Sequence, residues 1–401
     1  MNHSSRIFSR LFLFTLSLMV SLTASAQITR PERVGLSSQR LASIQTLMQE
    51  KIDNGEFSGA VTLVARDNKI AWFQAQGVID IESGRPMQKD SVFRIMSMTK
   101  PVVAFSILMM IEEGKVRLDD PVSRFIPELG NLNVAGQGKA TRDITVLDLL
   151  THTSGLMSGP QSNRGVSVDF SAGGALGDII PMLGAAPLEF EPGTRWAYSP
   201  MYGFDVLARI VEITSGTDFG TFTRSRIFDP LGMDNTFFYR DTPHPNLTTL
   251  YRNENGKLAK SPESFFMNGA YFSGGGGLSS TAEDYLQFAL MLLNEGEYNG
   301  KRLLGRRSVE VMRTAFIDDA LPGRNPGEGF GLGVRVITDP AANRTWLSEG
   351  TFGWSGAFNT HFFVDPQERL VAIYMTQISG AESRFTLRKD FETVVMQAIV
   401  E

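Results

Sequence analysis

Hydrophobic residues follow two different periods along the first part of the chain. Between Ser38 and Ile52, apolar residues recur every three or four positions, which predicts an amphipathic helix with Ser37 or Ser38 as its cap. From Val61 to Phe73 the period changes to two, and Asp67-Asn68 interrupts it with turn-forming residues. This second stretch predicts a β-hairpin.

A long apolar run with helical spacing follows Pro101, directly after Ser97-Met98-Thr99-Lys100. Because proline is tolerated in a first helical turn, we expect a helix with Ser97 at its N-terminal end and Lys100 one turn further on. Residues three apart share a helical face, so the Lys100 amine would reach the Ser97 hydroxyl. Such a serine is a candidate nucleophile. The same residues also fit a capping serine followed by a solvated lysine, so the motif needs support from elsewhere in the chain.

The remaining pattern separates a helical middle from a mixed C-terminal part. Strand signals are scarce between residues 115 and 240. After the glycine run at 274–277, the pattern predicts a helix over 281–293, strands over 331–337, 356–364 and 370–376, and a terminal helix over 384–400. We therefore expect an α/β (α+β) fold. Residues 27–114 and 270–401 would build one sheet with helices on it, and residues 115–269 would form an inserted helical domain of the same catalytic unit.

The first 26 residues have the pattern of a cleavable secretory signal peptide. Arg6 and Arg10 precede an apolar run from Leu11 to Leu22, and Ala24-Ser25-Ala26 is a small-residue cleavage signal. We expect cleavage after Ala26 and a periplasmic or secreted product without a membrane anchor. After this segment, the sequence has no run of the ~18 apolar residues that a spanning helix requires.

Composition excludes several kinds of function. The 401 residues are 42% hydrophobic and 20% charged, which suits one large or two closely joined globular domains. With 38 basic and 43 acidic residues, the chain is a poor candidate for binding nucleic acid or anionic lipid. The absence of cysteine excludes disulfides, a thiol nucleophile and thiolate metal sites. The histidines at 152, 244 and 361 lack a metal-binding spacing, so we expect no metal and no cofactor.

Three further motifs follow Ser97-x-x-Lys100 in order: Leu149 to Leu156 (LLTHTSGL), Trp196-Ala197-Tyr198-Ser199 after a Pro-Gly turn, and Gly353-Trp354-Ser355-Gly356. Together they resemble the serine β-lactamase-like superfamily, which includes class C β-lactamases and penicillin-binding proteins, and within it most closely the family VIII carboxylesterases. The resemblance covers nearly the whole chain after residue 26. It implies a β-lactamase/transpeptidase-like fold, with an antiparallel sheet flanked by helices and an inserted, mainly helical domain.

The resemblance also implies a role for each matching residue. Ser97 would attack a carbonyl to give an acyl-enzyme, with Lys100 and Tyr198 as its proton-transfer partners. Which of these two is the principal base stays open. Backbone N–H groups of Ser97 and Ala357 would form the oxyanion hole. Trp354-Ser355-Gly356 would line the substrate site.

Two departures from the β-lactamase pattern narrow the expected substrate. Pro200 stands where Tyr-x-Asn would place an asparagine, and Trp354 stands where Lys-Thr-Gly would place a lysine. Because an indole cannot pair with a substrate carboxylate, the motif favours a small-molecule ester with a neutral acyl group. A β-lactamase or D-alanyl-D-alanine carboxypeptidase acting on β-lactam or peptide, and an acyltransferase, remain alternatives. A silent wall-binding module is disfavoured because Ser97, Lys100 and Tyr198 are all present.

His152 could suggest a Ser-His-Asp triad, but the Gly-x-Ser-x-Gly motif that accompanies many such triads is absent. In the resembling family, the Thr-His-Thr-Ser-Gly stretch is structural. We therefore interpret His152 as a positioned core or loop histidine.

Overall fold

The computed structural model describes residues 26–159, 161, 174–238, 244–262, 270–380 and 384–401. The predicted signal peptide, except for Ala26, lies outside these residues. Within the described part, the helices are too short or too polar to cross a bilayer.

An antiparallel sheet, eight-stranded in the described part of the chain, forms the centre of the fold. Its strands, in spatial order, are β12 (Glu328–Phe330), β13 (Arg335–Ile337), β14 (Phe352–Gly356), β15 (Thr360–Asp365), β16 (Leu370–Met375), β1 (Gly59–Arg66), β2 (Lys69–Asp80) and β3 (Arg85–Pro86). The N-terminal hairpin joins the C-terminal strands where β1 pairs with β16, with Val61 opposite Met375. This pairing confirms the prediction that both ends of the chain build one sheet.

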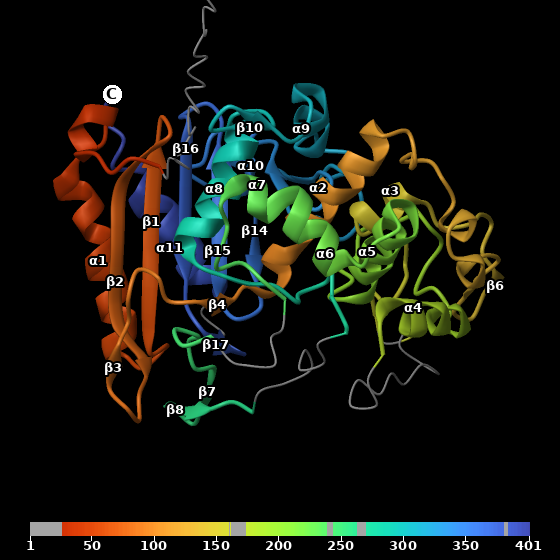
Figure 1. Ribbon diagram of the computed structural model, residues 1–401, viewed down its shortest axis with the longest axis horizontal. Helices are drawn as coiled ribbons and strands as arrows, with labels where there is room; N and C mark the ends of the chain where they lie inside the picture. Colours follow the sequence, from red (N-terminus) through yellow and green to blue (C-terminus); the bar gives the residue numbers. More distant parts are fainter. Residues whose placement is uncertain (1–25, 160, 162–173, 239–243, 263–269, 381–383) are drawn as a thin grey trace, which may run out of the picture.

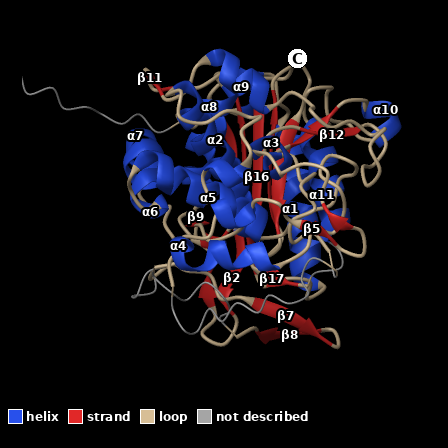
Figure 2. Cartoon of the chain, turned by 90° about the vertical axis from the view of Figure 1, so that its right-hand side faces the viewer, coloured by secondary structure: helices blue, strands red, loops and turns tan. Residues whose placement is uncertain are grey.

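Helices cover both faces of the sheet (Figures 1 and 2). Along β1, Val61 and Leu63 join the core under α2 (Thr99–Glu112) and α8 (Ala282–Leu293). Val64 points the other way, into the core under the helices α1 (Ser38–Asp53) and α11 (Arg384–Met396). The side chains on both faces of β1 are therefore buried, because helices cover both faces of the sheet.

Most of the predicted helices begin where expected. Ser37 caps α1 by accepting from the Arg40 amide, and Thr281 caps α8 by accepting from the Asp284 amide. Both side chains satisfy an amide that has no partner within its helix. The helix after Ser97 begins at Thr99, preceded by a 3₁₀ turn, Met96–Met98.

The strand predicted over 356–364 is confirmed from Thr360 onward as part of β15, but its first residues are wrong. Strand β14 ends at Gly356, a turn follows, and β15 begins at Thr360. The apolar residue Phe358 continues the alternation of apolar positions through the turn, so the sequence pattern does not indicate that a turn is present. Asn359 takes a left-handed φ of 63°, which asparagine tolerates better than most residues.

The middle of the chain lies beside the sheet (Figure 1). Its helices are α3 (Val146–Leu150), α4 (Leu176–Ile179), α5 (Tyr202–Ser215), α6 (Phe219–Thr223) and α7 (Asp229–Leu231). It also holds the short pairs β5 (Asn133–Val134) with β6 (Gly138–Lys139) and β7 (Tyr251–Glu254) with β8 (Lys257–Lys260). Strand β7 pairs with β17 (Ile378–Ser379), which follows the main sheet. The division at 115–269 stays a prediction, since residues 263–269 lie outside the described part.

Shorter elements complete the described chain. They are β4 (Phe93–Arg94), β9 (Ser279–Ser280), β10 (Glu297–Tyr298), β11 (Lys301–Arg302), α9 (Arg306–Met312) and α10 (Pro340–Asn343). The β4–β9 pair, with Arg94 opposite Ser279, fixes the chain just before Ser97.

Candidate active site

Ser97 lies at the junction between the 3₁₀ turn and α2. The turn begins at Met96, whose φ of 49° is unusual for a residue without special turn chemistry. The Lys100 Nζ donates to Ser97 Oγ at 3.2 Å, as the three-residue spacing predicts. Ser97 is 8% exposed and Lys100 is fully buried. A hydroxyl that remains accessible beside a buried amine is a suitable nucleophile.

Lys100 is held by three acceptors. Besides Ser97 Oγ, its Nζ donates to the carbonyl oxygens of Pro200 at 2.7 Å and Gly275 at 2.6 Å. An ammonium has three donors and no acceptor, so these contacts match it one for one. The Ser97 hydroxyl can donate as well as accept, so the contact with Ser97 also fits a neutral amine that accepts the serine proton. The two carbonyls hold the nitrogen beside the serine.

Asp205 fixes the loop that carries one of those carbonyls. From α5, its Oδ1 accepts from the Gly275 amide and the Ser273 hydroxyl, both at 2.8 Å, and its Oδ2 accepts from the Tyr271 hydroxyl at 2.7 Å. Burial raises the pKa of Asp205 above its ordinary value, although these hydrogen bonds and the charge of Lys100 oppose the shift. Asp205 could not be identified from the sequence, because one acid in an amphipathic helix carries no signal of its own.

Tyr198 completes the contacts of Ser97. Its hydroxyl donates to Ser97 Oγ at 2.7 Å, and its ring centroid lies 5.0 Å from Lys100 Nζ. The structure thus brings together Ser97, Lys100 and Tyr198, which are up to 101 positions apart in the sequence. The serine oxygen lies within hydrogen-bond distance of a cation and of a phenol that can carry a proton.

A cavity of about 280 Å³ opens beside these groups. It is lined by Ser97, Trp196, Tyr198, Arg335, Trp354, Ser355, Gly356, Ala357, Asn359, Thr360, Tyr374, Phe385 and Arg388. The Trp354 ring lies 5.6 Å from that of Tyr198, so β14 faces the catalytic side chains. Ala357 is the first residue of the turn after β14. The structure therefore places both predicted oxyanion donors, Ser97 and Ala357, on one cavity.

A buried charge cluster borders the cavity on the α11 side. Arg335 donates to Glu392 at 2.6 Å and to Glu328 at 3.2 Å. His361 joins this cluster to the substrate motif: its Nε2 lies 3.2 Å from Glu392 Oε1, and its Nδ1 lies 2.9 Å from Ser355 Oγ. Burial lowers the pKa of His361 to about 4, more than Glu392 raises it. His361 is therefore neutral near pH 7.

Four residues that line the cavity each carry a buried donor atom with no hydrogen-bond partner among the described residues. These atoms are Trp196 Nε1, Trp354 Nε1, Asn359 Nδ2 and Arg388 Nε. The Arg388 Nε lies 3.9 Å from Glu392 Oε1, which is too far for a hydrogen bond. All four are donors, so a substrate group that reached them would need to carry acceptors.

Two arginines that the sequence motifs did not indicate also line this wall. Arg335 and Arg388 reach the cavity from β13 and α11, and the side chain of Arg335 is almost fully buried. Glu328 and Glu392 compensate the charge of Arg335, while the Nε of Arg388 makes no hydrogen bond among the described residues. Neither arginine belongs to a motif, and the sequence offered no signal for them.

His152 is buried, and its Nδ1 accepts from the Ser199 amide at 3.2 Å. Burial, with a smaller contribution from Lys100, lowers the pKa of His152 well below its ordinary value. The structure thus agrees with its interpretation as a positioned histidine. Across the described residues, no group of three or more His, Asp or Glu side chains could hold a metal ion.

The chain is similar to known proteins along most of its length. The family model described as Beta-lactamase matches residues 44–395. Protein Rv1367c of Mycobacterium tuberculosis (strain ATCC 25618 / H37Rv) is 36% identical over 367 residues, covering 83% of this chain and 89% of the relative. Esterase EstB of Burkholderia gladioli is 31% identical over 374 residues, covering 86% and 93%. The solved structure of EstCE1, described as a hydrolase with promiscuous acyltransferase activity, superposes with a TM-score of 0.78 at 29% identity, covering 89% of this chain and 99% of its own.

Proposed function

This chain belongs to the β-lactamase family of serine hydrolases, and from that premise we propose that it cleaves carboxylic esters through an acyl-enzyme on Ser97. The observation that carries the proposal is the position of Ser97 Oγ, 3.2 Å from Lys100 Nζ and 2.7 Å from the Tyr198 oxygen. The name of EstB, an esterase similar to this chain along most of its length, supports an ester substrate.

Acylation needs one proton to leave Ser97. Lys100 already donates to two carbonyls, so its role is to keep a positive charge beside the reacting oxygens. Tyr198 is then the base. Its hydroxyl donates to Ser97 Oγ in the structure, so it must first lose that proton to solvent; the phenolate then accepts the serine proton while Ser97 Oγ bonds to the ester carbonyl carbon. The carbonyl oxygen becomes an oxyanion facing the amides of Ser97 and Ala357. Removing one such donor typically costs roughly 3–4 kcal/mol of transition-state stabilisation.

Collapse of this intermediate breaks the bond to the alcohol oxygen, and Tyr198 returns the proton to that leaving group. A water molecule then attacks the acyl carbon. Tyr198 accepts the water proton and passes it to Ser97 Oγ as the acid leaves. Each cycle thus consumes one ester and one water and releases an acid and an alcohol, with Ser97 and Tyr198 restored.

The cavity wall narrows the substrate class. Trp354 and Trp196 offer apolar surface, while Asn359 and Arg388 offer donors. An ester with an apolar part and a second acceptor group satisfies both kinds of surface. This substrate differs from the neutral acyl ester that Trp354 alone suggested.

Acyl transfer is a second candidate on the same site, because EstCE1 is described as a hydrolase with promiscuous acyltransferase activity. In that reaction, an alcohol replaces water in the second step, and Tyr198 accepts the alcohol proton. Product analysis with an added alcohol distinguishes the two: a new ester indicates transfer, and free acid alone indicates hydrolysis.

Export is also part of the proposal, on the strength of the signal pattern in residues 1–26. N-terminal sequencing of the protein from the periplasm or culture medium should begin at Gln27. A chain that keeps Met1 and stays in the cytoplasm would contradict export.

Intact-mass spectrometry after treatment with a fluorophosphonate tests the nucleophile. The wild type should gain one adduct and Ser97→Ala none. An adduct that persists in Ser97→Ala would overturn the assignment. Comparing p-nitrophenyl butyrate with nitrocefin tests the substrate class, and fast nitrocefin hydrolysis with negligible esterase activity would favour a β-lactamase.

A further inference from the structure

We propose that His152 is a positioning residue that holds the Tyr198 oxygen on Ser97. The inference rests on the proposed function, since it assigns a role within that reaction. It goes beyond the general interpretation of His152 as structural, because it names the catalytic group that this histidine controls.

His152 contacts three consecutive residues centred on Tyr198. Its backbone carbonyl accepts from the Ala197 amide at 3.0 Å, and its Nδ1 accepts from the Ser199 amide at 3.2 Å. Between these two bonds, its ring centroid lies 4.6 Å from that of Tyr198. The amides of the residues before and after the tyrosine are thus both bonded to His152. These bonds limit how far the phenol can move from Ser97.

The ring of His152 is suited to this role because it stays neutral. Since Nδ1 accepts a backbone hydrogen bond, the neutral ring carries its proton on Nε2. That nitrogen is buried and has no hydrogen-bond partner in the described part of the chain. The aromatic rings of Phe204 and Phe330 lie 5.2 Å away, and Trp196 lies 5.9 Å away. A charged imidazole in this apolar surrounding, near Lys100, would be strongly unfavourable.

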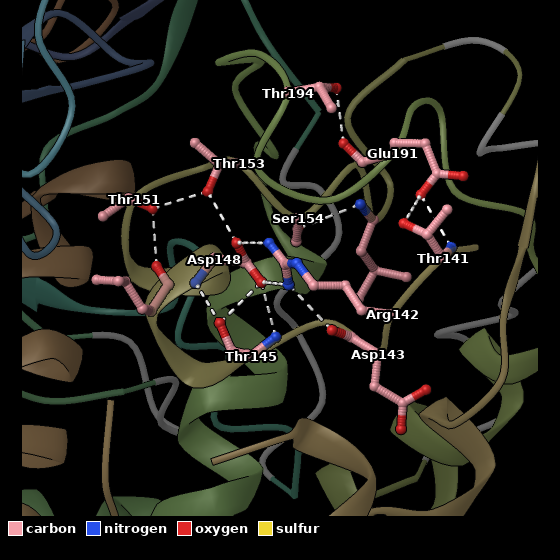
Figure 3. Close-up of polar contacts among 12 residues, drawn as sticks. Thr141, Arg142, Asp143, Thr145, Asp148, Thr151, Thr153, Ser154, Glu191 and Thr194 are labelled. Atoms are coloured by element: carbon pink, nitrogen blue, oxygen red, sulfur yellow. Dashed lines mark hydrogen bonds and ion pairs between the residues drawn. The ribbon is translucent and has the colours of Figure 1, made fainter. Parts of the chain in front are cut away.

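The loop around His152 is itself held in place. His152 has a φ of 58°, a left-handed conformation that most residues adopt only when their surroundings impose it. Figure 3 shows the polar contacts that do so. The hydroxyls of Thr151 and Thr153 bond to each other at 3.0 Å, and Thr153 donates to Asp148 at 3.3 Å. The Arg142 guanidinium donates two hydrogen bonds to the Asp148 carboxylate, of 2.6 and 2.9 Å.

These contacts form a continuous path to the reacting groups. Asp148 fixes the turn, the turn sets the position of His152, and His152 holds the residues on both sides of Tyr198. A displacement of about 1 Å in a catalytic group can cost roughly 100-fold in rate without loss of binding. Loss of the Nδ1 acceptor should therefore lower kcat and leave KM nearly unchanged.

Two amide variants separate this role from simple core packing. In His152→Asn, the side-chain oxygen can take the position of Nδ1, and asparagine tolerates the left-handed conformation. In His152→Gln, the amide lies one bond further out and cannot replace that acceptor. We expect kcat for p-nitrophenyl butyrate to fall by less than about 5-fold in Asn and by roughly 30- to 100-fold in Gln, at similar KM. Equal losses in both variants would overturn the proposal.

A double-mutant cycle tests the link to Tyr198. The measured quantity is the rate of fluorophosphonate labelling at Ser97, normalised to the labelled fraction at completion so that unfolded protein does not count. His152→Gln should slow labelling in the wild type and have no further effect when combined with Tyr198→Phe. The same slowing in both backgrounds would show that His152 acts without Tyr198.

The experiment also distinguishes the inference from the proposed function. If wild-type Ser97 is not labelled at all, the proposed function fails. If wild-type Ser97 is labelled and His152→Gln is labelled at the same rate, only the positioning role of His152 fails.

Discussion

The two walls of the cavity differ in how their polar groups are satisfied. The catalytic wall consists of Ser97, Lys100 and Tyr198, with Asp205 behind them. The Lys100 Nζ makes three hydrogen bonds, and the two carboxylate oxygens of Asp205 accept three. The recognition wall consists of Trp354, Asn359 and Arg388, each with a buried donor atom that lacks a hydrogen bond within the described structure. A fixed, satisfied set of groups suits chemistry that needs preorganised charge. A set of unused donors suits binding.

The unpartnered donors of the recognition wall carry a free-energy cost. A buried donor without a partner costs about 1–3 kcal/mol, which a substrate acceptor can recover on binding. The groups of the catalytic wall already have hydrogen-bond partners, so a bound substrate in its ground state adds few new hydrogen bonds there. We therefore expect changes in the catalytic wall to lower kcat and changes in the recognition wall to alter KM and substrate preference.

The largest predicted effect concerns Ser97. Ser97→Ala should lower ester hydrolysis at least about 10⁴-fold, because the acyl-enzyme can no longer form. Ser355→Ala is the matched control, since Ser355 is a second serine on the same cavity, bonded to His361 rather than to Lys100 or Tyr198. It should alter KM rather than abolish turnover. Steady-state kinetics with p-nitrophenyl butyrate measure both, and a larger loss in Ser355→Ala would reverse the assignment of the two serines.

The second prediction concerns the support of Lys100 by Asp205. Asp205→Ala leaves three buried donors without their acceptor and should lower stability by roughly 2–5 kcal/mol. Because the Gly275 carbonyl then loses its fixed position, kcat should fall roughly 10- to 100-fold. Asp205→Asn keeps an oxygen for the two bonds made to Oδ1, so its effects should be several-fold smaller. Urea unfolding and kcat report the two quantities, and equal losses in both variants would contradict this account.

The difference between the walls also explains what the sequence could predict. Ser97 and Lys100 are three residues apart on one helical turn, so their contact follows from local geometry. The contact with Tyr198 was implied by the order of motifs and by a family resemblance, and the fold realises it at 2.7 Å. Helix α1 and the β1–β2 hairpin were visible in their periodicity because burial on a regular element repeats at fixed intervals.

The rest depended on tertiary contacts that leave no periodic signal. Arg335 and Arg388 reach the cavity from two elements, 53 positions apart, and each resembles any other charged residue in its local sequence. Asp205 differs from a solvated helical acid only through the loop at residues 271–275 that folds over it. The turn after Gly356 was missed because Phe358 continues the strand pattern, and this turn carries Ala357, a predicted oxyanion donor.

The third prediction tests the recognition wall directly. Arg388→Gln removes a guanidinium from the cavity and should lower the preference for an ester that carries a carboxylate over its neutral analogue by about 5- to 10-fold. Trp354→Lys adds a charge to the same wall and should raise the same preference. Measuring kcat/KM for a matched pair, an alkyl ester and its ω-carboxylate form, gives the ratio. If neither variant shifts it, the unused donors do not contact substrate.

The smallest effect on catalysis is expected from the pH dependence of His361, which supports Ser355 from behind the recognition wall. Burial lowers the pKa of His361 to about 4 in the folded protein, against an ordinary value near 6.5. Between pH 6.5 and about 4, His361 therefore binds a proton in the unfolded chain but not in the folded protein. The stability contributed by the neutral ring is present above pH 6.5 and is lost as the pH falls towards 4.

Between pH 7 and pH 5, this one group should remove about 2 kcal/mol of unfolding free energy from the wild type. His361→Gln can keep polar contacts with Ser355 and Glu392 but cannot titrate, so it should lose about 2 kcal/mol less over the same interval. Urea unfolding at the two pH values measures the difference, and kcat at pH 7 should change little because His361 does not contact Ser97. Parallel pH dependence in both proteins would show that His361 accepts its proton in the folded state. In that case, the charge that favours a substrate carboxylate would increase in acid, and the difference between the walls would itself depend on pH.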